Sequence, residues 1–166
     1  MASDTVTRRA ATEEDDGFLY DLFKAVRLPE FAFVAMAPAQ LELLIRMQYA
    51  GQKLSYGGQY PNGHEIVLLD GNPVGRIWVY RAPEEHHLVD ISLMPESRNR
   101  GIGSALVREA IAAAREAGVR LCCSVALTNP GSLRFHQRLG FRIVGQDEVY
   151  YDLAWEPTCP DSNHSS

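Results

Sequence analysis

The chain has 166 residues, of which 46% are hydrophobic and 22% are charged, and its net charge is −5 at pH 7. This length and composition are typical of one globular domain whose core needs neither disulfides nor a metal for support. A mildly acidic chain without an apolar run of about 20 residues is not expected to bind nucleic acid nonspecifically or to cross a membrane.

The first 80 residues predict one strand, two helices and two more strands, at residues 5–9, 13–28, 38–55, 65–69 and 74–80. Thr12 is placed to cap the first helix, and Pro38 is a favoured residue for the first turn of the second. Gly57-Gly58 should stop that second helix. After this helix the apolar residues recur with the period of a strand, which predicts an antiparallel pair of strands around the turn at residues 70–73.

The second half predicts a strand, a helix and three further strands, at residues 88–94, 102–117, 120–127, 141–144 and 149–155. The strands on either side of the helix should be parallel, because a strand–helix–strand crossover requires it. The fold class is therefore α/β, with a largely antiparallel sheet flanked by helices and one parallel pair. We expect a single domain over residues 1–156 and a disordered tail over residues 157–166.

The three cysteines, Cys122, Cys123 and Cys159, have no spacing typical of metal ligands. Neighbouring residues on a strand point to opposite faces, so Cys122 and Cys123 are poorly placed to pair with each other. Residues 1–4 lack the charged and then apolar pattern of a signal peptide. We therefore expect reduced cysteines, no metal and a cytoplasmic location.

A loop with two glycines lies between the strand at 88–94 and the helix at 102–117, and it reads Arg98-Asn99-Arg100-Gly101-Ile102-Gly103-Ser104. Glycine lets the backbone approach a ligand closely, and the N–H groups at the start of a helix favour an anion. The loop lacks the lysine of a P-loop and the third glycine of a dinucleotide fingerprint. It therefore predicts a phosphate cradle of another kind.

A second motif follows about 25 residues later, in the segment that runs from Asn129 to Phe141. The matching positions are Asn129, Ser132, Phe135, Leu139, Gly140 and Phe141. Together the two motifs resemble the GNAT superfamily of acetyl-CoA-dependent N-acetyltransferases. The resemblance spans residues 8–155, and one position departs from the pattern, because His136 stands where the family usually has a tyrosine.

The resemblance implies acetyl-CoA as co-substrate and a GNAT-like fold in which the pantetheine arm pairs with a strand. The main chain of Ile91, Ser92 and Leu93 would hold that arm, and an N–H at or near Leu93 would polarise the thioester carbonyl. The pyrophosphate would lie on the loop from Arg98 to Ser104. The second motif would add Asn129, Ser132 and Phe135 to the cofactor site, with Asn129 also placed to cap its helix.

Proton transfer has more than one candidate residue in the sequence. An amine must be neutral to attack, so a general base is expected, and the candidates are Asp90 and His87. His136 is the candidate for protonating the leaving thiolate, with packing beside the sheet as its alternative role. A bulge in this strand, usual in the family, would decide which side chains share a face.

The function that the resemblance implies is acetyl transfer to a primary amine of a small molecule or peptide, by direct attack in a ternary complex. The alternatives are a catalytically silent acyl-CoA-binding module and a transferase for another acyl-CoA. Four polar and aromatic residues of the second helix recur every fourth position and either line an acceptor pocket or form a half-exposed face: Gln48, Gln52, Tyr56 and Tyr60. A homodimer is common in the family, whereas the sequence leaves the oligomeric state and the acceptor open.

Overall fold

The structure is a computed structural model that describes residues 4–158. The predicted disordered tail lies mostly outside these residues, and Cys159 lies wholly outside them. Two compact units form the described chain: unit 1 holds residues 4–80 and 89–105, and unit 2 holds residues 81–88 and 106–158. No helix in this range is long and apolar enough to cross a membrane.

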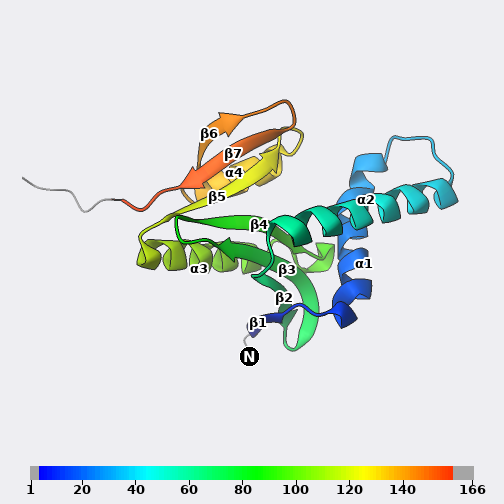
Figure 1. The fold of residues 1–166 in the computed structure, drawn as a ribbon. Coiled ribbons are helices and arrows are strands. Elements are labelled where there is room, and N and C mark those ends of the chain that lie inside the picture. The colour runs from blue at the N-terminus through cyan, green and yellow to red at the C-terminus, as the bar shows by residue number, and fades with distance from the viewer. Residues whose placement is uncertain (1–3, 159–166) are drawn as a thin grey trace, which may run out of the picture. The chain divides into compact units, whose positions relative to one another are not determined.

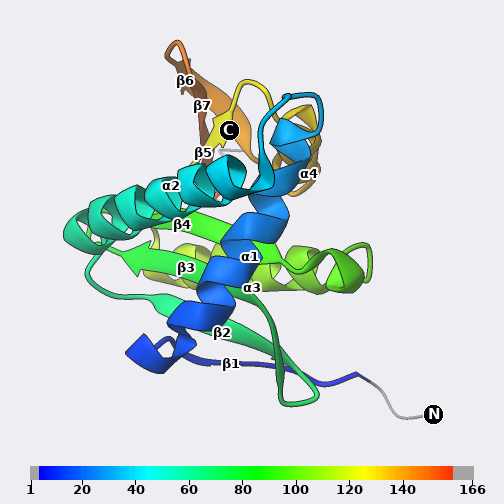
Figure 2. The ribbon, with the colours of Figure 1, turned by 90° about the vertical axis from the view of Figure 1, so that its right-hand side faces the viewer.

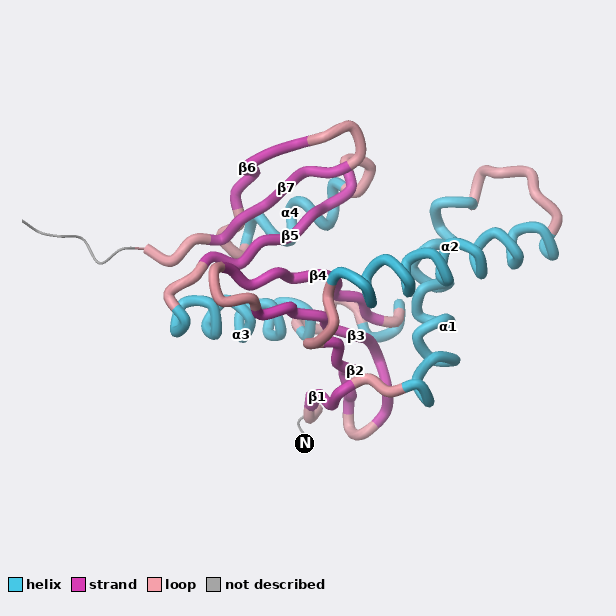
Figure 3. Tube along the Cα trace, viewed as in Figure 1, coloured by secondary structure: helices cyan, strands magenta, loops and turns pink. Residues whose placement is uncertain are grey.

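Seven hydrogen-bonded strands follow the order β1-β2-β3-β4-β5-β7-β6, and Figures 1 and 3 show them with their helices. They are β1 (Val6–Ala10), β2 (His64–Leu69), β3 (Asn72–Arg81), β4 (Glu85–Leu93), β5 (Arg120–Ala126), β6 (Arg142–Gln146) and β7 (Tyr150–Trp155). The sheet is mostly antiparallel, and β4 pairs in parallel with β5. The predicted α/β class and the parallel pair are therefore confirmed. The strand β4 begins at Glu85, earlier than predicted, so His87 lies inside it.

Four α-helices accompany the strands in the described chain: α1 (Asp16–Arg27), α2 (Pro38–Gln59), α3 (Ile102–Ala117) and α4 (Pro130–Arg138). Helix α3 has the predicted bounds, and Gly118 follows it with φ of 70°. The predicted end of the second helix was wrong, because α2 continues through Gly57 and Gly58. A Cβ at either glycine would meet nothing within 4 Å, so neither glycine is required by close packing against another element. The ring contact of Tyr56 with Trp78 holds the last turns in place.

The core of unit 1 lies where the two N-terminal helices cover strands of the sheet. Helix α1 crosses β2 and β3 in Figure 2, and α2 lies beside α1. Tyr20 and Phe23 of α1 pack with Ile45 and Tyr49 of α2. Ile45 is fully buried, as are Ile66, Val67 and Ile77 of the strands. Burial of large apolar side chains drives this packing.

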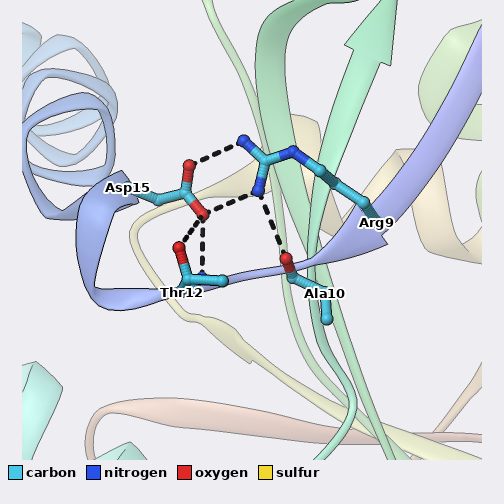
Figure 4. A network of polar contacts seen from close by, with 4 residues as sticks. All are labelled: Arg9, Ala10, Thr12 and Asp15. Atoms are coloured by element: carbon cyan, nitrogen blue, oxygen red, sulfur yellow. Dashed lines mark hydrogen bonds and ion pairs between the residues drawn. The ribbon is translucent and has the colours of Figure 1, made fainter.

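An ion pair fixes the turn that leads into α1. The Arg9 guanidinium donates to both oxygens of Asp15, at 2.7 and 2.8 Å, and the N–H of Thr12 donates to the same carboxylate at 2.8 Å (Figure 4). These bonds lower the pKa of Asp15 from 3.8 to about 2, because they stabilise the ionised form. Thr12 caps a short 3-10 helix, Glu13–Asp15, with Asp15 as its partner, so the predicted cap lies one turn before α1, whose own N-cap is Asp15.

The core of unit 2 forms around β5 and β7, whose register pairs Leu121 with Trp155 and Cys123 with Leu153. These four side chains are buried, together with Val107 of α3. Gly140 adopts φ of 100° against the Trp155 ring, where a Cβ would come within 3.3 Å of the indole. The positive φ and the nearby indole therefore explain why glycine stands in the Leu-Gly-Phe sequence of the second motif.

Candidate active site

The glycine loop of unit 1 is a tight turn between β4 and α3. Asn99 and Gly101 have φ angles of 60° and 79°, in the left-handed region. The space beside Gly101 is open, so its conformation rather than crowding favours glycine at this position. The turn aims the chain directly into the first turn of α3.

The start of α3 presents backbone donors. The N–H of Ala105 bonds to the carbonyl of Gly101 at 3.1 Å and begins the helical ladder. The N–H groups of Ile102, Gly103 and Ser104 precede that ladder and have no acceptor within the helix. Such a helix start attracts an anionic group.

The two arginines of the loop have protein partners. Arg98 donates from Nε to the carbonyl of Leu93 at 3.0 Å, so it ties the loop back to the end of β4. Arg100 forms an ion pair with Asp4 on the surface. Both side chains remain exposed. Their predicted phosphate contacts would therefore add to these bonds or replace them.

The C-terminal half of β4 carries the residues expected to face the acyl group. Ile91, Ser92 and Leu93 are half-buried. Ser92 Oγ donates to Asp90 Oδ2 at 2.9 Å. Gly75 of β3 lies against this segment so closely that a Cβ there would come within 2.3 Å of the Ser92 carbonyl oxygen. Glycine at position 75 therefore permits the close approach of β3 and β4 at the predicted thioester site.

A cavity of about 800 Å³ opens in unit 1 between the N-terminal helices and the strands β2 and β3. Aromatic residues form much of its wall: Tyr49 and Tyr56 of α2 and Trp78 of β3. Its charged lining residues include Asp16 and Lys53, which bond to each other at 2.9 Å. This size and mixture of apolar wall with a few polar groups are typical of small-molecule sites.

Arg76 is the most deeply buried charged side chain of that wall, with 8% of the residue exposed. Its Nε donates to Asp90 Oδ2 at 2.6 Å, and its Nη2 donates to Gln52 Oε1 at 2.8 Å. The predicted base Asp90 therefore lies in an ion pair at the edge of the acceptor-sized cavity. Two of the four stripe residues, Gln52 and Tyr56, line this cavity, whereas Gln48 is exposed.

His64 completes the same wall. Its ring stacks on Trp78 with centroids 4.3 Å apart and planes 8° from parallel. Burial is the main cause that lowers the pKa of His64 to about 4, and the positive charge of Arg76 adds to it. The imidazole is neutral at physiological pH and brings no further charge into the cavity.

The second motif forms helix α4 of unit 2. The Asn129 side chain accepts the N–H of Ser132 at 3.1 Å, so its predicted capping role is confirmed. Ser132 and Phe135 lie on this helix and are half-buried. The structure describes these residues within unit 2 and the glycine loop within unit 1. Their joint contribution to one cofactor site stays a prediction.

A sequence model of the acetyltransferase (GNAT) family matches residues 30–141, which include the glycine loop and the second motif. The chain belongs to the GNAT family. An uncharacterised N-acetyltransferase of Methanocaldococcus jannaschii is 32% identical over 88 residues, which are 48% of this chain and 39% of that protein. An L-amino acid N-acetyltransferase of Escherichia coli is 30% identical over 91 residues, 51% of this chain and 56% of that protein. The matches thus span about half of the relatives' length or less.

Solved GNAT structures share the fold of this chain. The PaiA N-acetyltransferase of Thermoplasma acidophilum, crystallised with coenzyme A, superposes with a TM-score of 0.70 at 19% identity. The match covers 92% of this chain and 99% of that one. At this identity the comparison establishes the fold alone.

His136 departs from the tyrosine usual in the family, and its surroundings are those of a packed residue. It is 5% exposed and lies edge-on to the rings of Phe135 and Phe141. Its Nδ1 lies 2.8 Å from the carbonyl oxygen of Ser132. Because a carbonyl can only accept, Nδ1 carries the proton of the neutral ring. Burial lowers the pKa of His136, which favours this neutral form.

The remaining titratable candidates of this GNAT protein lie in unit 2. His87 is half-buried on β4, opposite Cys122 in the parallel register, and burial lowers its pKa. Burial raises the pKa of the Cys122 thiol to about 11 and that of Cys123 to about 12. Both thiols are free and protonated, which is not the state of a cysteine nucleophile.

Three residues of the cavity wall were not among the site candidates predicted from the sequence: Arg76, His64 and Tyr49. One signal was available for Arg76, since a single charged residue interrupts the otherwise apolar run from Val74 to Val79. A buried charge is retained only with partners, so such an interruption indicates a partner or a site. For His64 and Tyr49 the sequence offers no comparable signal.

Proposed function

We propose that the protein transfers the acetyl group of acetyl-CoA to a primary amine of a small molecule or peptide, by direct attack in a ternary complex. The observation that carries this proposal is the left-handed turn at Asn99 and Gly101. It leads into the start of α3, where the N–H groups of residues 102–104 precede the first bond of the helix. In a chain of the GNAT family, this arrangement suits the pyrophosphate of the co-substrate.

Two properties of the glycine loop support acetyl-CoA as the co-substrate. The open space beside Gly101 leaves room for phosphate oxygens against the backbone. Arg98 and Arg100 are exposed and supply positive charge at the same loop. The main chain of Ile91, Ser92 and Leu93 would hold the pantetheine arm, and Asn129, Ser132 and Phe135 would contribute from α4. The bound co-substrate supplies the activated acetyl group.

The chain's own residues would bind and orient the acceptor and manage its proton. The cavity in unit 1 is large enough for a small amine. Arg76 lines this cavity and donates a hydrogen bond to Asp90. Asp90 and His87 stay the candidates for general base, with water as a carrier. An N–H at or near Leu93 would stabilise the oxyanion. The E. coli relative is named for L-amino acids, so amino acids belong in an acceptor screen.

One observation favours the alternative of a catalytically silent acyl-CoA-binding module. The neutral His136 ring uses its N–H on the Ser132 carbonyl, so it is not arranged to protonate a leaving thiolate. In the active enzyme that we propose, the thiolate, with a pKa near 8.5, would leave to solvent. A cytoplasmic location and a homodimer stay predictions.

Thermal unfolding with and without acetyl-CoA tests the proposal. Ligand at about 100 times its Kd should stabilise the folded protein by about 2.7 kcal/mol. Gly103→Glu places a carboxylate in the anion site and should abolish this shift. Gly51→Glu adds the same charge on the exposed face of α2, where a Cβ meets nothing, and should keep it. A folded parent that shows no shift at millimolar acetyl-CoA would contradict the proposed function.

Thiol release from acetyl-CoA in the presence of an amine panel then separates the two functions. Release that depends on an amine identifies the transferase. A thermal shift without thiol release for any amine identifies the silent binding module. Propionyl- and succinyl-CoA in the same assay measure the acyl preference.

A further inference from the structure

We propose that the acceptor carries an oxygen on the carbon next to its amine-bearing carbon, as in an α-amino acid or a peptide N-terminus, and that Arg76 recognises this oxygen. This inference rests on the proposed function and specifies its substrate class. It makes Arg76 a residue that determines specificity. Three features of the structure support it.

The first feature is the rigid placement of the guanidinium. Its Nε is held by Asp90 at 2.6 Å and its Nη2 by Gln52 at 2.8 Å, so partners from β4 and α2 fix its plane. The side chain is 10% exposed, and Arg76 lines the cavity of about 800 Å³. A group fixed in this way loses little further freedom when it binds a ligand.

The second feature is the unused donor of the same group. Among the described residues, no side chain or carbonyl accepts a hydrogen bond from Arg76 Nη1. In the described part of the chain, the fully buried side-chain atoms that lack a partner are His64 Nε2 and His86 Nδ1, and Arg76 Nη1 does not belong to them. It therefore reaches solvent, and the cavity is the space that Arg76 lines. A guanidinium N–H donates only, so a ligand group that replaces water at Nη1 must be an acceptor such as a carboxylate or carbonyl oxygen.

The third feature is the position of Arg76 relative to the predicted reacting groups. Its partner Asp90 directly precedes residues 91–93, which are expected to hold the acyl donor, and Asp90 also accepts from Ser92 at 2.9 Å. An amine that attacks at this part of β4 would bring the oxygen, three bonds from its nitrogen, toward the guanidinium. Recognition of that oxygen would fix the direction of attack by the amine.

Arg76 disfavours simple alkylamines and diamines as acceptors, because they have no oxygen that could accept from Nη1. The aromatic rings of Tyr49, Tyr56 and Trp78 can pack against an apolar side chain of the acceptor. An α-amino acyl group therefore matches the wall at both its oxygen and its side chain.

Matched acceptors test the inference on the unaltered protein with acetyl-CoA as donor. Three sets keep the side chain and change the oxygen: glycine, glycinamide and methylamine; leucine, leucinamide and 3-methylbutylamine; phenylalanine, phenylalaninamide and 2-phenylethylamine. Rates are compared per concentration of neutral amine, because the amine pKa values differ. The amines that lack oxygen should have kcat/KM about 10- to 100-fold lower than their best partner in each accepted set.

The amide arm distinguishes the two sources of the oxygen. A preference for the acid over the amide identifies a carboxylate and hence a free amino acid. Equal rates for acid and amide, or a faster amide, identify a carbonyl oxygen and hence a peptide N-terminus. Both results support the inference. Amines without oxygen that react as fast as their partners would overturn it and leave the proposed function standing. Failure to acetylate any amine would overturn both.

Variants of Arg76 test its role directly. Arg76→Gln should lower kcat/KM for the preferred acceptor about 10- to 100-fold, by raising its KM. The same variant should change kcat/KM for the matched amine without oxygen, and the KM of acetyl-CoA, by less than about threefold. Arg142→Gln removes a surface arginine that pairs with Glu156 and should leave both acceptors unchanged. An equal loss for acceptors with and without oxygen would contradict the assignment.

Loss of a buried cation beside Asp90 is expected to affect folding as well, so stability is measured in parallel. The double variant Arg76→Gln and Asp90→Asn removes both charges together and avoids an unpaired carboxylate. An acetyl-CoA-induced thermal shift equal to that of the parent shows that the donor site is intact. Stabilisation by the preferred acceptor, measured by the same method, should be lost in both variants.

Discussion

Arg76 of β3 and Asp90 of β4 lie on neighbouring strands with 2.6 Å between Nε and Oδ2, and Ser92 Oγ donates to the same oxygen at 2.9 Å. Gln52 of α2 holds the far side of the guanidinium. The chain of bonds thus connects a helix, the cavity wall and the strand expected to hold the acyl group. A residue predicted as a general base is, in the folded protein, the anchor of a buried cation.

Gly75 should be intolerant of a side chain. Gly75→Ala places a Cβ within 2.3 Å of the Ser92 carbonyl, so β3 and β4 must separate there, and we expect the free energy of unfolding to fall by about 1–3 kcal/mol. Gly58→Ala in α2 is the matched control, since its Cβ would meet nothing within 4 Å. This variant should raise the free energy of unfolding by about 0.5–1 kcal/mol. Urea unfolding of both variants measures these changes. Equal stability of the two variants would argue against the close approach.

The Arg9–Asp15 pair predicts a pH-dependent contribution to stability. Asp15→Asn removes the ion pair while keeping the shape, and we expect a loss of about 1–2 kcal/mol at pH 7. The folded pKa of about 2 lies below the ordinary value of 3.8, so the stabilisation is present above pH 4 and declines as pH falls toward 2. The difference between parent and variant in urea unfolding should therefore narrow from pH 5 to pH 3.

Glu14→Gln is the control for this pH series, because it removes a neighbouring carboxylate whose side chain is exposed. Its free energy of unfolding should follow that of the parent at every pH. If the difference between parent and Asp15→Asn stayed constant down to pH 3, the ion pair would not be its source.

His136 is predicted to act through packing and its bond to Ser132. His136→Asn keeps a donor near the Nδ1 position, whereas His136→Gln moves it, so the Gln variant should lose more stability, by about 1 kcal/mol. The pH dependence of kcat should be the same in both variants as in the parent, since a neutral ring donates no proton. A loss of kcat of about 100-fold or more with unchanged stability would instead assign His136 to leaving-group protonation.

The cysteines should not take part in the reaction. With thiol pKa values of about 11 and 12, Cys122 and Cys123 hold little thiolate at pH 7.5. In a Cys159→Ser background, iodoacetamide should label the folded protein far more slowly than the unfolded chain. The Cys122→Ala variant should retain the parent's acetyl transfer. Rapid labelling of the folded protein, accompanied by loss of activity, would require a covalent mechanism to be considered.

Much of the local structure followed from the sequence by itself. The place of the glycine loop between β4 and α3, the bounds of α3 and the capping of α4 by Asn129 depend on backbone preferences of residues a few positions apart. Alternation of apolar residues and the crossover rule gave the strands and the parallel pair of β4 with β5. These features carry the family resemblance, because the loop is expected to bind the co-substrate through its main chain.

Only the tertiary structure decided what the side chains do. Helix α2 passes Gly57 and Gly58 because Tyr56 packs on Trp78, a contact between residues distant in sequence. Arg76 meets Asp90 and Gln52 through strand pairing and helix packing, and burial sets the neutral state of His136. Burial and partner identity are properties of the assembled fold, so spacing in the sequence could propose Asp90 and His136 but could not assign their roles.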